Sequence, residues 1–330
     1  MPPRTSTIST WARGPAKPIR VIARIAAGLA ALAVAGPIHA QEPLAELAGR
    51  LAGMSAPVGY EAAAADSIAA LLPGAQRDRA GNVVLRPPSG TAQRLVACPL
   101  DEPGWVIGGV RDDGYLTVRR LPGRTPPLFD QHLEGHRVTL FGRRGPVPGV
   151  VAIRSTHLTR GRPVDEAPFT SDQAFVDVGA RTAEEAHALG IGVTTPLTAA
   201  KQPHRYGTSL LAAPVAGRRA ACAALARAAA GARRRVSAVA FVVEQGLGAR
   251  GLLTAINEAG PFDDVLLVDG GEGDEPVTVS ADTIRFGAIV QRITRWTLRT
   301  RFGGTPVETV DLADAAELER RIAAWLRGGP

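Results

Sequence analysis

The sequence is poor in lysine, cysteine and aromatic residues. Lysine occurs only as Lys17 and Lys201, and the remaining basic residues are arginines, as is typical of proteins from GC-rich genomes. Cys98 and Cys222 are the only cysteines in 330 residues, which excludes a disulfide framework and, without other ligands, a structural zinc site. They could still form one disulfide, although two small buried side chains are the simpler interpretation. Because 45% of the residues are hydrophobic, the chain is expected to bury a core.

The excess of positive charge is confined to the N-terminus. The formal net charge is +7, but Arg4, Arg13, Lys17, Arg20 and Arg24 all precede the first acidic residue. Without these five, 33 basic residues face 31 acidic ones. Such a small and scattered excess does not form a phosphate-binding stripe, so no nucleic-acid partner is expected.

Residues 1–40 are predicted to be a signal peptide. The basic stretch is followed by an apolar run of 12 residues at 25–36, whereas a bilayer span needs about 20. Pro37 and the small residue Ala40 before Gln41 suit cleavage. An uncleaved membrane anchor is the alternative. We therefore expect an exported protein, periplasmic or secreted, that has no membrane contact after cleavage.

After the leader, helical and extended patterns alternate along the chain. Leu44, Leu47 and Leu51 have helical spacing. Helices are predicted at 42–54, 60–72, 182–189, 216–230 and 312–326, and strands at 82–85, 94–98, 236–243 and 264–269. Strands that alternate with helices predict an α/β fold with a mostly parallel sheet sandwiched by helices.

The pattern changes in the middle of the chain. From residue 105 to 178, short β segments are separated by glycine and proline, which is typical of a small barrel or sandwich. We therefore expect an α/β domain made of residues 41–111 and 181–330, interrupted by an inserted small β-barrel domain at 112–180.

Eight stretches of the mature chain, taken in order, carry a family resemblance. They are SAPVGYE (55–61), GN (81–82), LVACPLDEPGWVIGGVRDDGYLTV (95–118), GHRVTLFGRRGPVPGVVAIRSTHL (135–158), FVDVGARTAEEAHALGIG (175–192), FVVEQGLGARG (241–251), VLLVDGGEGDEP (265–276) and TRFGGTPVETVDLADA (300–315). In this order they resemble the zinc aminopeptidases of the tetrahedral-particle and glutamyl aminopeptidase type, also described as cellulase-like. The resemblance implies a parallel-sheet aminopeptidase domain with an inserted β-barrel.

The resemblance also implies a site for two zinc or cobalt ions, which would polarise the scissile carbonyl and activate a water. The family's first ligand is the histidine of a His-x-Asp-Glu motif, and here Pro99 stands in its place. Asp101 matches the carboxylate that would orient the missing imidazole. The family's bridging aspartate is matched by Ala213, which has no ligand atom.

The other ligand positions are also altered. The family's Glu-Glu pair, a general base followed by a ligand, falls on Gln245 and Gly246, or on Glu244 and Gln245 if the register slips by one. An aspartate at a strand end is retained as Asp269, and the last histidine is replaced by Gly304. Asp269 is thus the one retained ligand position of five, and we expect no metal cofactor.

The histidines of the mature chain do not rebuild this site. They are His132, His136, His157, His187 and His204, and none forms a metalloprotease pair on a helix. We interpret them as surface or locally hydrogen-bonded side chains.

The sequence therefore predicts an exported, catalytically degenerate member of this family. It would act without catalysis, by binding peptides or by assembling with itself or with an active relative. The alternative is a residual metallo-aminopeptidase with a non-standard metal site, hydrolysing peptides from the N-terminus. We expect a homo-oligomer formed through the barrel, with Leu140, Val147 and Val150 as candidate contacts.

Overall fold

The computed structural model describes residues 42–87, 92–152, 167–232, 236–286 and 289–329. The predicted signal peptide and His157 lie outside these residues. Within them, no helix is long and apolar enough to cross a membrane.

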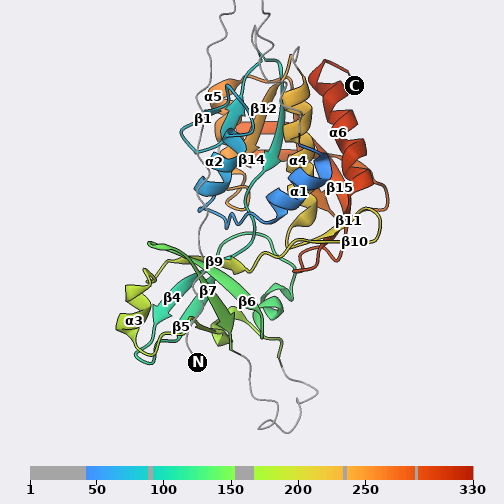
Figure 1. The fold of residues 1–330 in the computed structure, drawn as a ribbon. Coiled ribbons are helices and arrows are strands. Elements are labelled where there is room, and N and C mark those ends of the chain that lie inside the picture. The colour runs from blue at the N-terminus through green and yellow to red at the C-terminus, as the bar shows by residue number, and fades with distance from the viewer. Residues whose placement is uncertain (1–41, 88–91, 153–166, 233–235, 287–288, 330) are drawn as a thin grey trace, which may run out of the picture. The chain divides into compact units, whose positions relative to one another are not determined.

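A ten-stranded mixed sheet forms the α/β domain (Figure 1). Its strands are β1 (Gln76–Arg77), β2 (Val83–Leu85), β3 (Arg94–Pro99), β10 (His204–Tyr206), β11 (Leu210–Ala212), β12 (Ala238–Val242), β13 (Asp264–Gly271), β14 (Val277–Phe286), β15 (Ile289–Arg301) and β16 (Thr309–Asp311). The order is β1-β2-β12-β3-β13-β15-β16-β11-β10, and β14 also pairs with β15. The central strands β12, β3, β13 and β15 are parallel, and the outer strands pair antiparallel. The apolar runs predict β12, β3 and β13, whereas the arginine-rich strand β15 was not predicted.

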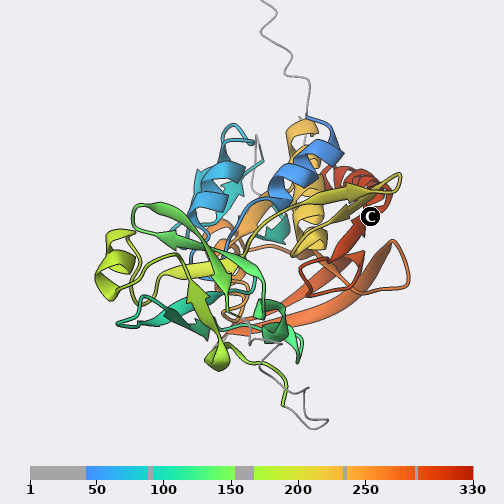
Figure 2. The same ribbon diagram turned by 60° about the horizontal axis from the view of Figure 1, so that its bottom comes forward.

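Helices cover both faces of this sheet (Figures 1 and 2). They are α1 (Leu44–Ala52), α2 (Ala62–Ala69), α4 (Ala216–Gly231), α5 (Arg250–Ala259) and α6 (Leu312–Leu326). The helices α1, α2, α4 and α6 share one core with Val96 and Cys98, whereas α5 packs with Leu95 and Ala97 on the other side. Successive residues of β3 thus serve opposite cores, which explains its uninterrupted apolar sequence.

A closed six-stranded barrel forms the inserted domain, in the order β4-β5-β8-β7-β6-β9. Its elements are β4 (Trp105–Val110), β5 (Leu116–Arg120), η1 (Phe129–Leu133), β6 (Arg137–Gly142), β7 (Gly145–Val151), η2 (Ser171–Gln173), β8 (Phe175–Asp177), α3 (Ala183–Ala188) and β9 (Pro196–Ala199). The barrel therefore extends beyond the expected bounds of 112 and 180 on both sides. Trp105 pairs with Leu197, so β4 and the four-residue strand β9 close the barrel together.

The barrel strands also decide which residues can meet a partner. Leu140 pairs directly with Val147, so both side chains share one face, and Leu140 is fully buried in the barrel core. Val147 packs against the same core. Val150 lies three residues further along and points outward, with 48% of its surface exposed. Leu140 is therefore wrong as a contact candidate, and Val150 remains.

Cys98 and Cys222 form a disulfide between β3 and α4. Both residues are buried, as the simpler interpretation requires, and the pairing that the sequence left open is present. The sequence separation of 124 residues gave no sign of the pairing. The bond ties the end of a central strand to the helix that covers it.

Replacing both cysteines, as Cys98→Ala with Cys222→Ala, is expected to lower the free energy of unfolding by about 2–4 kcal/mol, because a cross-link restrains the unfolded chain. Urea titration measures the loss. In a reductant, the free energy of unfolding of the native protein should fall to nearly that of the double variant. The free energy of unfolding of the double variant itself should not change with the reductant. Two thiols that react in unreduced, unfolded protein would contradict the disulfide.

Candidate functional site

The residues at the family's ligand positions converge where β3 and β13 end. Leu267 pairs with Ala97, so Asp269 and Pro99 lie two residues further along neighbouring parallel strands. The first turn of α4 comes close to the same edge, since a Cβ atom on Gly270 would lie 2.4 Å from the carbonyl carbon of Gly217. The α4 helix therefore presents its next residue directly to both strand ends.

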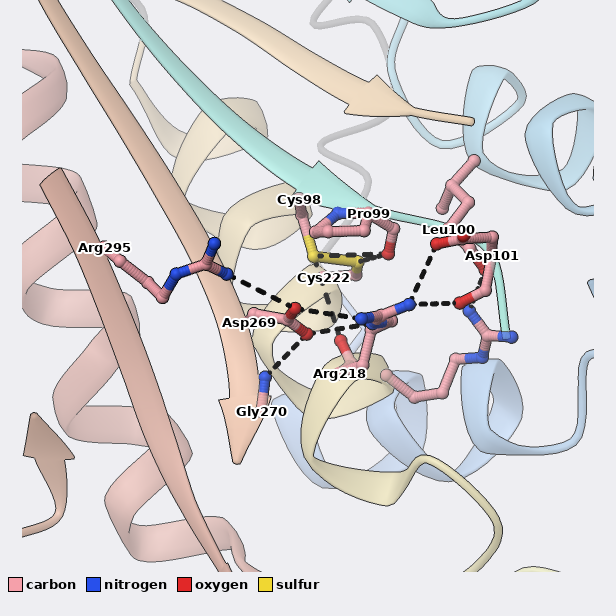
Figure 3. Close-up of a disulfide and its surroundings, with 10 residues drawn as sticks. Cys98, Pro99, Leu100, Asp101, Arg218, Cys222, Asp269, Gly270 and Arg295 are labelled. Carbon is pink, nitrogen blue, oxygen red and sulfur yellow. Dashed lines mark hydrogen bonds and ion pairs between the residues drawn. A yellow bond between two sulfur atoms is a disulfide. The ribbon is translucent and has the colours of Figure 1, made fainter. Parts of the chain in front are cut away.

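That next residue, Arg218, bridges two buried carboxylates (Figure 3). Its Nε and Nη2 donate to the two oxygens of Asp269 at 2.8 and 2.9 Å. Its Nη1 donates to Oδ1 of Asp101 at 2.8 Å and to the Asp101 carbonyl at 2.6 Å. One guanidinium thus joins the retained ligand, Asp269, to the carboxylate expected to orient a ligand, Asp101.

The surroundings keep this bridge charged. Burial disfavours the charge of Arg218, but attraction to Asp269 and Asp101 outweighs burial and raises the pKa of the guanidinium. Burial raises the pKa of Asp101, whereas Arg218 and the amide of Gly246 act in the opposite direction. Gly246 donates to Oδ2 of Asp101 at 2.6 Å, and Gly270 donates to Asp269 at 2.8 Å. Each carboxylate therefore has hydrogen-bond donors besides the arginine.

The disulfide lies beside this bridge (Figure 3). Cys222 follows Arg218 by one helical turn on α4, and Cys98 precedes Pro99 at the end of β3. The Cys222 sulfur lies 3.2 Å from the Pro99 carbonyl oxygen. Covalent and ionic links therefore fasten the same helix to the same strand end.

A second buried ionic group surrounds Glu102. Its Oε1 accepts from the amide of Ala56 at 2.8 Å, and its Oε2 accepts from Nζ of Lys201. Nη2 of the fully buried Arg219 lies 3.6 Å from Oε2. Burial lowers the pKa of Lys201, and Glu102 acts in the opposite direction.

Arg218, Arg219 and Lys201 were not predicted from the sequence. Positive charges in the first turn of a helix oppose its dipole. The Arg218-Arg219 pair at the start of an alanine-rich helix was therefore the signal that buried carboxylates lie opposite. Nothing local marks Lys201, because its partner Glu102 is 99 residues away in the sequence.

The candidate general-base positions do not join the bridge. Glu244 pairs with Arg250 at 3.2 Å, and its amide donates to Glu61 at 2.9 Å. The side-chain oxygen of Gln245 is buried without a hydrogen-bond partner in the part of the chain that the structure describes. Within the described residues, neither Gln245 nor Glu244 forms a hydrogen bond or an ion pair with Asp269.

Other groups fill the space at the remaining ligand positions. Ala213 is buried, and its amide donates to the carbonyl of Glu308. The Glu308 side chain accepts from the amides of Gly217 and Gly304 at 2.9 and 3.0 Å, and burial raises its pKa. Gly304 has φ +71°, and a Cβ atom there would lie 2.5 Å from Cγ of Pro126.

These residues do not fit the family's pair of metal ions. Pro99, Ala213, Gly246 and Gly304 offer no side-chain donor, and the guanidinium of Arg218 lies between Asp101 and Asp269. Within the described ranges, no group of three or more histidine, cysteine, aspartate or glutamate side chains could share an ion. His132, His136, His187 and His204 are accordingly not assembled into a site.

Comparisons with known proteins agree with the fold and with the sequence resemblance. Lysyl aminopeptidase of Pyrococcus furiosus is 30% identical over 139 residues, which are 41% of this chain and 39% of that protein. SgcX of Escherichia coli, named provisionally as an aminopeptidase, is 32% identical over 152 residues, which are 45% of this chain and 39% of that protein. The alignment thus spans about two fifths of each curated relative.

Solved structures match over a longer part of the chain. The TET1 peptidase of Pyrococcus horikoshii superposes with a TM-score of 0.73 at 18% identity, covering 86% of this chain and 99% of that one. At that identity the likeness establishes the fold. The M42 glutamyl aminopeptidase family matches residues 81–276, more than half of the sequence. The chain therefore belongs to the M42 glutamyl aminopeptidase family.

Proposed function

We propose that this protein is a non-catalytic member of the M42 family, which binds peptide ends in its cleft and assembles with copies of itself. The observation that carries the proposal is the bridge from Arg218 to Asp101 and Asp269. A metal ion at Asp269 needs the carboxylate oxygens that the guanidinium already holds. The cation that balances these carboxylates is therefore part of the chain.

The covering segment of the barrel supports the proposal. Residues 121–127 follow β5, and within them Pro126 contacts Gly304 while the Pro122 carbonyl lies near Gly246. Restoring a histidine at position 304 would require both a left-handed backbone for a non-glycine residue and displacement of Pro126. The absence of ligand side chains at positions 246 and 304 is therefore what allows residues 121–127 to pack closely against them.

We propose further that the protein is exported. The apolar run and Ala40 support a cleaved leader, and the Cys98–Cys222 disulfide suits an oxidising compartment. After cleavage the chain would begin at Gln41, as a periplasmic or secreted protein.

Purified protein refolded with excess zinc or cobalt is expected to retain no stoichiometric metal and to leave aminoacyl anilides intact. Its melting temperature should not change with EDTA, because no metal contributes folding energy. Elemental analysis, a hydrolysis assay and thermal melting test this, with an active zinc aminopeptidase as the positive control. Bound zinc that is lost in Asp269→Ala, together with hydrolysis, would establish the residual-peptidase alternative.

Arg218→Met is expected to lower the free energy of unfolding by about 3–5 kcal/mol, because it leaves two buried carboxylates without their cation. The matched control is Arg50→Met, which breaks the exposed pair with Glu42 and should cost less than about 1 kcal/mol.

The loss in Arg218→Met should also depend on pH. Burial raises the pKa of Asp101 and Arg218 acts in the opposite direction, so without the guanidinium this pKa lies higher in the folded state. The variant therefore regains stability as the pH falls and Asp101 becomes protonated. Urea titrations at pH 4 and 7 should show the smaller deficit at pH 4. An equal deficit at both values would show that Arg218 acts through packing alone.

The mature chain is expected to be at least a homodimer. The structure of the TET1 peptidase is described as assembling into a tetrahedron or an octahedral shell, and we propose assembly here through the barrel. Val150→Asp should weaken the oligomer in light scattering, whereas Val193→Asp, which alters another exposed valine, should not. Native protein with the mass of one chain at micromolar concentration would refute assembly.

A further inference from the structure

A pocket lies beside the Arg218 bridge, with an enclosed part of about 50 Å³ within about 440 Å³ of space that includes open solvent. One wall comes from the barrel, with Trp105, Phe129 and His132, and the other comes from the α/β domain, with Pro214, Val215 and Pro306. Apart from His132 and the residues at its floor, the lining is mainly apolar.

The aromatic wall of the pocket is held rigidly. The rings of Trp105 and Phe129 stack with centroids 4.9 Å apart, and His132 meets Phe129 edge-on. The Trp105 indole donates to the buried carboxylate of Asp130 at 3.2 Å, and the amide of Ser171 holds its other oxygen at 3.0 Å. A preformed wall of this kind lowers the entropic cost of binding a flat or branched apolar group.

The polar floor of the pocket, made by Glu102 and Lys201, offers hydrogen-bond donors. Both oxygens of Glu102 are occupied, one by the Ala56 amide and the other by Lys201. The ammonium of Lys201 can donate three hydrogen bonds, and within the described residues it makes only the one to Glu102. The neighbouring Arg219 approaches Glu102 from outside the lining of the pocket.

Two cations approach the Glu102 carboxylate. Lys201 and Arg219 both lie near its Oε2, and Lys201 also experiences the negative charge of Glu308. An incoming ammonium group would meet like charge at Lys201. An incoming carboxylate would meet spare N–H donors, and hydrogen bonds between charged groups are the stronger kind.

Exposed apolar residues adjoin part of the lining in the sequence. Phe302 and Val307, each 59% exposed, flank Gly304, Thr305 and Pro306. Phe302 also has φ +56°, a conformation that is costly for a bulky residue and is often found at functional sites.

We propose that this pocket binds an apolar group that ends in a carboxylate, as in the C-terminal residue of a peptide or in a free apolar amino acid. The apolar group lies between the Trp105–Phe129 wall and Val215, and the carboxylate accepts hydrogen bonds from Lys201. This inference rests on the proposed peptide-binding function and specifies which end of the ligand is recognised.

Calorimetry with three matched probes tests the polarity. N-acetylphenylalanine carries only the carboxylate, phenylalanine amide carries only the amine, and N-acetylphenylalanine amide carries neither. The first should bind at least about tenfold more tightly than the other two. Tightest binding of phenylalanine amide, or no binding of any probe, would overturn the inference. The metal and hydrolysis assays report separately on the loss of catalysis.

A longer probe identifies the source of the carboxylate. An acetylated tetrapeptide that ends in phenylalanine should bind more tightly than N-acetylphenylalanine if the ligand is a peptide. Equal or weaker binding of the tetrapeptide would show that the ligand is a free acid. The recognised group would still be an apolar group that ends in a carboxylate.

Two kinds of variant place the binding in this pocket. Lys201→Met removes the ammonium of the floor and leaves Glu102 paired with Arg219, and it should abolish the preference for the carboxylate. Ala199→Leu fills the lined space and should weaken N-acetylphenylalanine at least about tenfold. Its matched control is Ala188→Leu, on the exposed side of α3, which should bind normally. Unchanged binding in Ala199→Leu would place the ligand elsewhere and refute the proposal.

Discussion

Two neighbouring buried carboxylates are costly to keep ionised unless a cation lies between them, and the architecture of this site follows from that constraint. Asp101 and Asp269 end adjacent strands of the sheet, where the fold brings them together irrespective of what balances their charge. In this chain the balancing charge is Arg218, delivered by the first turn of α4. The close approach of Gly217 to Gly270 is what allows that helix to reach both strands.

The links around this point act together. The disulfide fixes β3 to α4, Glu308 joins the start of α4 to the segment after β15, and the barrel residues 121–127 cover the glycines at positions 246 and 304. The contacts of Glu308 and of residues 121–127 lie at positions that the family resemblance matches to metal ligands. Together these links form a structural junction, and the proposed ligand pocket lies beside it.

The sequence predicted what depends on single residues or on local periodicity. The apolar run of β3, the alanine-rich helix α4 and the absence of donors at Pro99 and Ala213 needed no three-dimensional information. The arginine bridge and the disulfide depend on which distant segments meet, and no local pattern carries that information. The inward side chain of Leu140 depends on the strand register, which inverts with a shift of one residue. The four-residue strand β9 is too short to be recognised from the sequence, and its pairing in the closed barrel is what identifies it as a strand.

The position of the disulfide has a topological consequence. Cys98 and Cys222 lie just outside the first and last barrel strands, so the bond closes a covalent ring that contains the entire barrel domain. A single proteolytic cut in any barrel loop would leave the two fragments joined. Tension applied to the two chain ends would run through the disulfide and bypass the barrel. A protease that cuts the barrel would therefore leave the two parts of the α/β domain covalently joined.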